Sequence, residues 1–140
     1  VDLFNQAGYS VYVDWIEDQQ LDRSKVNAAT ANTLRERMEL SKSLAYVATS
    51  NSSNSKWCPW ELGYVDALKN GRCAILPIMK DDSSTFKGQE YLGLYPFIDY
   101  ALNKNTHTYE FWVNDPQSGN YISLGEWLSG ANPYNHNSQE

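Results

Sequence analysis

The chain is poor in cysteine, in basic residues and in long apolar runs. Two cysteines, Cys58 and Cys73, are too few for a disulfide framework, so a reducing cytoplasm is the expected compartment. Lys and Arg number 11 against 17 Asp and Glu, and the net charge of −6 with no basic block argues against binding of duplex nucleic acid. The longest apolar run, residues 73–79, is too short to cross a bilayer, so no membrane segment is expected.

Other absences from the sequence argue against several kinds of functional site. The two histidines, His107 and His136, are isolated, and no spacing of His, Cys or Asp predicts a metal site. The glycine-rich phosphate loops and the nucleophile elbow of hydrolases are also missing from the sequence. Aromatic residues, in contrast, are abundant, with 5 Trp and 10 Tyr, and their rings either fill a core or stack on flat ligands.

The first 80 residues alternate between strand and helix patterns. We predict strands at residues 9–15, 43–49 and 73–79, and helices at residues 1–7, 24–40 and 57–69. Gly8 is the expected stop of the first helix and Asn70-Gly71 that of the third, and the apolar run at 73–79 predicts a strand buried on both faces. This β–α–β–α–β order predicts an α/β fold with an open parallel sheet and helices on both faces. Such a sheet needs a strand before its first helix, so the first strand is expected to be missing from the numbered chain.

The second half of the chain is less regular. A short strand within residues 91–101, broken by Pro96, and a second strand at 109–113 are expected. Ser123 and Glu126 have the spacing of a capping box that opens a last short helix. We predict one domain over residues 1–130 and a frayed tail over 131–140.

The most informative stretch follows the predicted strand at 43–49. It reads Ser55-Lys56-Trp57-Cys58-Pro59-Trp60-Glu61-Leu62 and leads from a loop of Ser and Asn into a helix. Trp57 and Glu61 are four residues apart, so they share one face of that helix. Ligands of open α/β sheets bind at the carboxyl ends of the strands, where this helix begins. An indole and a carboxylate there could hold a flat cationic ring and its sugar.

This stretch resembles the S-x-W-C-x-x-E-L signature of TIR (Toll/interleukin-1 receptor) domains. The preceding SLAYVATS and the following CAILPIM are similar to the third and fourth strands of that family, and SVYVDW to its second strand. The resemblance covers roughly residues 1–80 and is strongest to stand-alone bacterial TIR proteins of antiphage defence, of the Thoeris type. It implies a flavodoxin-like TIR domain.

The resemblance also implies an activity. Bacterial TIR domains cleave NAD+ at the nicotinamide–ribose bond, and the glutamate of the motif, here Glu61, is their catalytic residue. Nicotinamide leaves as a neutral molecule, so no metal and no cofactor beyond NAD+ as substrate are expected. A carboxylate beside the ribose stabilises the developing oxocarbenium ion. Attack by water gives ADP-ribose, and attack by a group of the same molecule gives a cyclic ADP-ribose.

The same resemblance implies binding residues and partners. Trp57, Trp15 and Ser50 are the expected contacts to NAD+, because the matching regions flank the substrate in TIR enzymes. Homo-oligomers are expected, because neighbouring TIR subunits complete the pocket. A separate effector protein that senses the product is the other expected partner.

Other interpretations of these residues stay open. Glu61 also fits an ordinary first-turn glutamate that the helix dipole favours, and Trp57 a side chain that packs the helix on the sheet. Trp60 is expected in the core, and Cys58 as a small apolar residue instead of a nucleophile. The whole chain could instead be a TIR adaptor that binds other TIR domains without chemistry, or an enzyme similar to nucleoside deoxyribosyltransferases.

Overall fold

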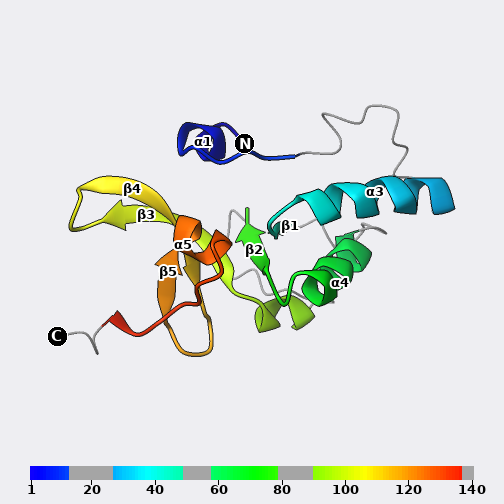
Figure 1. Ribbon diagram of the computed structural model, residues 1–140. Helices are drawn as coiled ribbons and strands as arrows, with labels where there is room; N and C mark the ends of the chain where they lie inside the picture. Colours follow the sequence, from blue (N-terminus) through cyan, green and yellow to red (C-terminus); the bar gives the residue numbers. More distant parts are fainter. Residues whose placement is uncertain (13–26, 49–57, 79–89, 137–140) are drawn as a thin grey trace. The chain divides into compact units, whose positions relative to one another are not determined.

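The computed structural model describes residues 1–12, 27–48, 58–78 and 90–136 (Figure 1). It divides the chain into two compact units, residues 1–41 and 42–140, and each unit is described by itself. The first unit holds helices α1 (Asp2–Gln6) and α3 (Ala28–Leu40), and the second holds the sheet. Among the described residues, no helix has the length and apolar character needed to cross a membrane.

Helix α1 confirms the helix predicted at the start of the chain. Gly8 follows it with φ +92°, a left-handed conformation that glycine adopts without strain, so the predicted stop is confirmed as well. The strand predicted at residues 9–15 is wrong for residues 9–12, which have no strand partner; the rest of it lies outside the described residues. Instead, the Tyr12 ring packs under the Arg37 guanidinium, 5.2 Å from the ring centroid.

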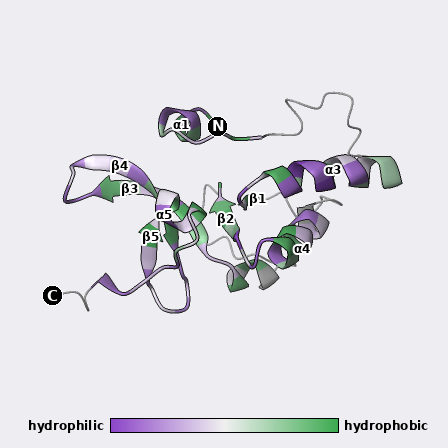
Figure 2. Cartoon of the chain, in the orientation of Figure 1, coloured by the Kyte–Doolittle hydropathy of each residue, from purple (hydrophilic) through white to green (hydrophobic). Residues whose placement is uncertain are grey.

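Helix α3 begins later than the sequence predicted. Asn27 caps it, because its side-chain oxygen accepts the Thr30 N–H at 2.9 Å, and this capping bond sets the start of the helix. Thr30, Leu34 and Met38 are buried at intervals of four residues, while the other positions are mostly polar (Figure 2). The helix therefore buries one stripe of its surface and leaves most of the rest exposed.

The second unit contains a five-stranded sheet. Its strands are β1 (Leu44–Ala48), β2 (Cys73–Pro77), β3 (Phe97–Asn103), β4 (Thr108–Asn114) and β5 (Tyr121–Ser123), in that spatial order. β1, β2 and β3 run parallel, as predicted, whereas β3, β4 and β5 pair antiparallel, so the sheet is mixed. The connections from β3 to β4 and from β4 to β5 are too short for the crossover that parallel neighbours require.

The parallel half of this sheet confirms the predicted α/β fold class. Three consecutive parallel strands in sequence order match the second half of the flavodoxin-like order 2-1-3-4-5. Helix α4 (Cys58–Leu68) packs on β1 and β2, and helix α5 (Leu124–Leu128) packs on β4 and β5. A 3₁₀ helix, η2 (Glu90–Leu94), precedes β3, which begins directly after Pro96. Proline fits there because it lacks the N–H that a ladder needs.

The hydrophobic core of this unit lies between the sheet and these helices. Cys73, Ala74 and Ile75 of β2 are almost fully buried, which confirms the prediction of a buried strand. The other buried apolar side chains of the unit are Tyr46, Ala48, Leu62, Val65, Leu92, Ile98, Phe111, Val113, Ile122, Leu124 and Trp127. The core thus runs from α4 through β2 to the antiparallel strands and α5.

A helix cap and several contacts of residues 134–136 order the end of the described chain. The Ser123 side chain accepts the Glu126 N–H at 3.3 Å, which confirms the cap predicted for α5. After α5, the Tyr134 N–H donates to the Tyr121 carbonyl, and the His136 ring stacks on both tyrosines at 3.8 and 4.0 Å. The sequence predicted a frayed tail over residues 131–140; Tyr134 and His136 make these contacts, and residues 137–140 lie outside the described residues.

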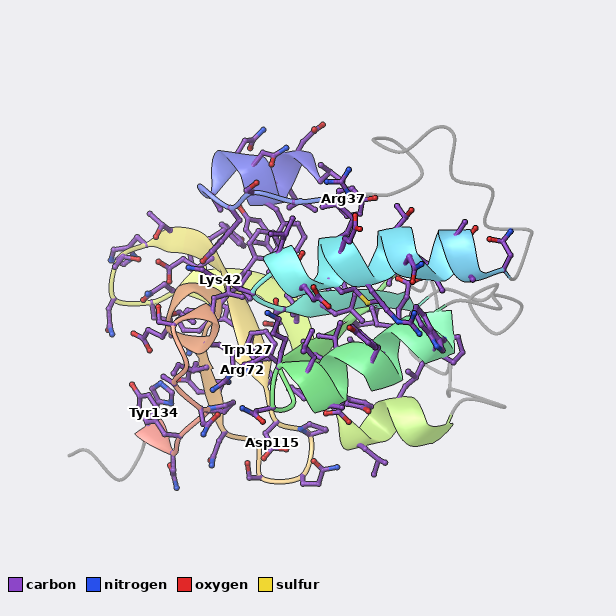
Figure 3. The ribbon with its side chains drawn as sticks, turned by 45° about the vertical axis from the view of Figure 1, so that its right-hand side comes forward. Arg37, Lys42, Arg72, Asp115, Trp127 and Tyr134 are labelled. Atoms are coloured by element: carbon purple, nitrogen blue, oxygen red, sulfur yellow. The ribbon has the colours of Figure 1, made fainter. Side chains whose placement is uncertain are left out.

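Arg72, directly before β2, joins β2 to the end of α5 (Figure 3). Its guanidinium donates to the carbonyls of Gly130 and Ala131 and lies 5.4 Å from the centre of the Trp127 ring. A planar fork above an indole can satisfy two neighbouring carbonyls at once, here two in the turn that follows α5. Arg72 therefore ties the parallel strands to the antiparallel ones through side-chain contacts.

We expect Arg72→Lys to lower the free energy of unfolding by about 1–2 kcal/mol, because lysine keeps the charge and loses the two-carbonyl fork. Urea unfolding followed by tryptophan fluorescence measures this difference. Arg35→Lys is the matched control, since Arg35 is exposed on α3 and donates to the Asn32 side chain on the same helix; it should change the free energy of unfolding by less than about 0.5 kcal/mol. Equal losses in the two variants would contradict the role of Arg72.

Candidate functional site

The candidate site lies at the start of α4, and the topology fixes where that start is. The Leu44 N–H donates to the carbonyl of Arg72, just after α4, at 3.1 Å, so the end of α4 is near the amino ends of β1 and β2. Asn70 (φ 53°) and Gly71 (φ 80°) make the tight reversal between helix and strand, which confirms the predicted stop. The first turn of α4 must then lie toward the carboxyl ends of the two strands. That is the edge at which open α/β sheets bind ligands.

Glu61 is in this first turn and is half-buried. Its neighbours Leu62 and Val65 are 1% and 2% exposed, so they form the face of α4 that packs on the sheet. With about 100° between successive residues, Glu61 lies on the flank of that face. The structure therefore places a half-buried carboxylate at the expected edge of the sheet.

The other predicted contacts to NAD+ are Trp57, Trp15 and Ser50. All three lie outside the described residues, as does the side chain of Cys58. Their roles stay predictions, and so does the catalytic role of Glu61.

Trp60 departs from its expected place. It is not among the buried core residues; it is half-buried and stacks on Tyr64, with ring centroids 5.7 Å apart and an angle of 20° between the planes. The prediction of a core position was wrong because the core face of α4 is set by Leu62 and Val65, and Trp60 is turned well away from both.

A hydrogen bond that the sequence did not predict holds the other end of α4. The Tyr95 hydroxyl donates to Asp66 Oδ2 at 2.9 Å, and Tyr95 is two residues before the start of β3 at Phe97. This bond fixes the second half of α4 to the entry of the third parallel strand. No local sequence pattern links two residues that are 29 positions apart.

Cys73 carries the one strongly shifted pKa among the described residues. Burial, and secondarily the charge of Asp66, raises the pKa of the Cys73 thiol to about 12. Its Sγ contacts the Leu62 carbonyl at 3.6 Å, inside the core. A thiol of this kind stays protonated at neutral pH and is not a nucleophile.

We therefore expect Cys73 to resist iodoacetamide in the folded protein. With a pKa raised from 9.0 to about 12, the thiolate is rare at pH 8 and its fraction grows only near the upper value. Peptide mapping by mass spectrometry after native labelling should find Cys73 unmodified, and the same reaction in guanidinium should modify it fully. Complete native labelling at pH 8 would contradict the buried, protonated state.

Among residues 1–12, 27–48, 58–78 and 90–136, no group of three or more His, Cys, Asp and Glu side chains could hold a metal ion.

Comparison with known proteins identifies two bacterial relatives, and no family model matches the chain. A protein of Bacillus cereus (strain MSX-D12), named as a probable 3′ cyclic ADP-D-ribose synthase, ThsB′, is 52% identical over 124 residues, which are 86% of this chain and 62% of that protein. A protein of Cytobacillus dafuensis, named as a candidate cyclic ADP-D-ribose synthase, TIR2, is 40% identical over 62 residues, which are 44% of this chain and 16% of that protein.

The chain thus spans less than two thirds of the length of either relative. The similarity to the first one nevertheless extends well beyond the motif around Glu61, because it covers most of the chain. The sequence and the α/β fold together show that the chain resembles bacterial TIR proteins of the Thoeris type, which confirms the resemblance that the S-x-W-C-x-x-E-L motif indicated.

Proposed function

We propose that this chain cleaves NAD+ at the nicotinamide–ribose bond and releases a cyclic ADP-ribose. The observation that carries the proposal is the 52% identity, over 86% of the chain, to a protein named as a 3′ cyclic ADP-D-ribose synthase. The place of Glu61 supports it, because the carboxylate stands at the edge of the sheet where ligands bind.

The proposed reaction needs from the protein mainly a negative charge that is held beside the ribose. Nicotinamide in NAD+ is already cationic, so the bond breaks without a proton donor, and positive charge moves to the ribose. A half-buried carboxylate at Glu61 stabilises that charge more strongly than a carboxylate in bulk water. A hydroxyl oxygen of the same ADP-ribose then attacks the ribosyl cation and releases its proton to solvent as the ring closes, whereas attack by water, with the same loss of a proton, gives the linear product.

The remaining parts of the proposal rest on the resemblance. Trp57, Trp15 and Ser50 would contact NAD+, which is the substrate, and no further cofactor takes part. The product would act as a signal for an effector protein in cytoplasmic defence against phage. A second copy of the chain would complete the pocket; turnover per chain that stays constant on strong dilution would contradict this need.

Incubation with NAD+, followed by liquid chromatography and mass spectrometry, tests the activity. The expected products are nicotinamide and a species with the mass of cyclic ADP-ribose, and the proportion of linear ADP-ribose separates cyclase from hydrolase. A parallel incubation with 2′-deoxyadenosine tests the deoxyribosyltransferase alternative. Absence of nicotinamide release would contradict the proposal, and absence of any reaction would favour a binding adaptor.

A further inference from the structure

Strands β3 and β4 form a two-stranded arm that extends beyond the rest of the sheet (Figure 1). Among the described strands, β3 pairs with β2 only through Phe97, and β5 pairs only with residues 112–114 of β4. Residues 98–103 and 108–111 therefore pair with each other and with no third strand in the described sheet. A two-stranded hairpin is only marginally stable in water by itself, so the arm depends on what its faces pack against.

One face of this arm is apolar and aromatic from its base to its tip. The cross-strand pairs on it are Ile98 with Val113, Tyr100 with Phe111, and Leu102 with Tyr109. Toward the tip, Tyr100, Leu102 and Tyr109 are 44%, 45% and 62% exposed, whereas the other three side chains are buried. The Tyr100 ring centroid lies 5.6 Å from that of Tyr109 and 4.8 Å from that of Phe111. The three exposed side chains, here named the tip patch, thus continue the buried apolar face into solvent.

Hydrogen bonds at the end of the arm hold the tip patch in place. In the turn between the strands, Asn103 Oδ1 accepts the N–H groups of Asn105 at 2.9 Å and Thr106 at 3.4 Å. The His107 N–H donates to the Asn103 carbonyl at 2.8 Å, which closes the turn. A surface that is ordered before it meets a partner loses less conformational entropy on binding. The tip patch is therefore well suited to a contact with another protein surface.

The charged side chains of the arm lie away from the tip patch. Asp99 and Glu110 are on the opposite face, where they accept hydrogen bonds from Asn114 at 3.0 Å and from Asn103 at 2.9 Å, and Lys104 is in the turn. Because the chain has a net charge of −6, two copies repel each other over much of their surface. At the tip patch two copies can meet without bringing like charges together. A strongly charged partner would find no opposite charge there.

We propose that the tip patch is a contact surface between two copies of this chain. In a twofold pair the same patch faces itself, and tyrosine is enriched at the centre of such contacts. With roughly 200 Å² for a whole tyrosine side chain, the patch exposes about 300 Å². A stable complex buries about 800 Å² per partner, so the pair should form reversibly and dissociate on dilution. The contact is independent of NAD+ chemistry, so its failure would leave the proposed function as it stands.

Sedimentation velocity of the whole chain without substrate, over a wide range of protein concentrations, tests this contact. The parent should shift from monomer to dimer as the concentration rises. Tyr109→Glu places a negative charge from each copy in the contact and should raise the Kd of the dimer about tenfold or more. Leu102→Glu, at the paired position of β3, should act in the same way, so the test does not depend on the folding of one variant. Tyr109→Phe keeps the ring and should keep the Kd of the parent.

The control is Leu94→Glu, the same type of change at a leucine of η2 that is 74% exposed and lies outside the arm. It adds the same charge to the chain and should leave the Kd close to that of the parent, which separates a local effect from general repulsion. A parent that stays monomeric at every concentration would overturn the proposal. Equal Kd values in Tyr109→Glu and Leu94→Glu would also overturn it, because the copies would then meet through another surface.

Discussion

Glu61→Gln should lower kcat for NAD+ cleavage by about 10²–10³-fold, the usual effect of removing one charge-stabilising group from an active site. Glutamine has nearly the same shape as glutamate and can still accept a hydrogen bond from a ribose hydroxyl. It lacks the negative charge that the oxocarbenium-like transition state requires. Because that interaction is made mainly in the transition state, KM should change much less than kcat. Steady-state measurement of nicotinamide release gives both constants.

The matched control for this variant is Glu36→Gln, the same change at an exposed position of α3. It should leave both kinetic constants and the thermal midpoint as in the parent. The melting curve of Glu61→Gln should also stay close to that of the parent, since Glu61 is only half-buried and keeps its volume in glutamine. Full turnover by Glu61→Gln would remove this residue from the mechanism.

Local signals predicted those parts of the fold that depend on neighbouring residues. The apolar run at 73–79 gave a buried β2, and the Asn70-Gly71 pair, with φ of 53° and 80°, gave the reversal before it. The spacing of Ser123 and Glu126 predicted a cap that the structure has. Each of these features is decided within one turn or one strand, so the sequence alone carries it.

Contacts between distant residues could not be predicted in this way. The bond from Arg72 to Gly130 spans 58 positions and that from Tyr95 to Asp66 spans 29, and neither has a sequence signature. The antiparallel pairing of β3, β4 and β5 was missed for a related reason. The residue pattern of a strand predicts that a strand exists but not whether it runs parallel or antiparallel to its neighbour. Here the connections from β3 to β4 and from β4 to β5 are short, and short connections join antiparallel strands.

The candidate site contains one feature that the local sequence predicted and one that it did not. The motif placed Glu61 in the first turn of a helix after a parallel strand, and that placement is confirmed. The role of Trp60 was misjudged, because apolar character alone does not say which side of an apolar helix meets the sheet. Only the burial of Leu62 and Val65 shows that Trp60 is turned outward.

The largest loss of stability from one substitution is expected at the centre of the parallel strands. Ile75 is 1% exposed, pairs in register with Tyr46 of β1 and Phe97 of β3, and donates its N–H to the Pro96 carbonyl at 2.8 Å. Ile75→Ala keeps the backbone bonds and leaves a cavity where two strands and their covering side chains meet. We expect the free energy of unfolding to fall by about 2–5 kcal/mol.

Urea unfolding followed by tryptophan fluorescence measures this loss as a lower midpoint with an unchanged slope. The control is Leu102→Ala, which removes a similar volume from a β3 side chain that is 45% exposed; its effect should stay within about 0.5 kcal/mol. Similar losses at both positions would mean that Ile75 is no better packed than a surface leucine. A much larger loss at Ile75 would establish that the packing around β2 is a main source of the stability of the sheet.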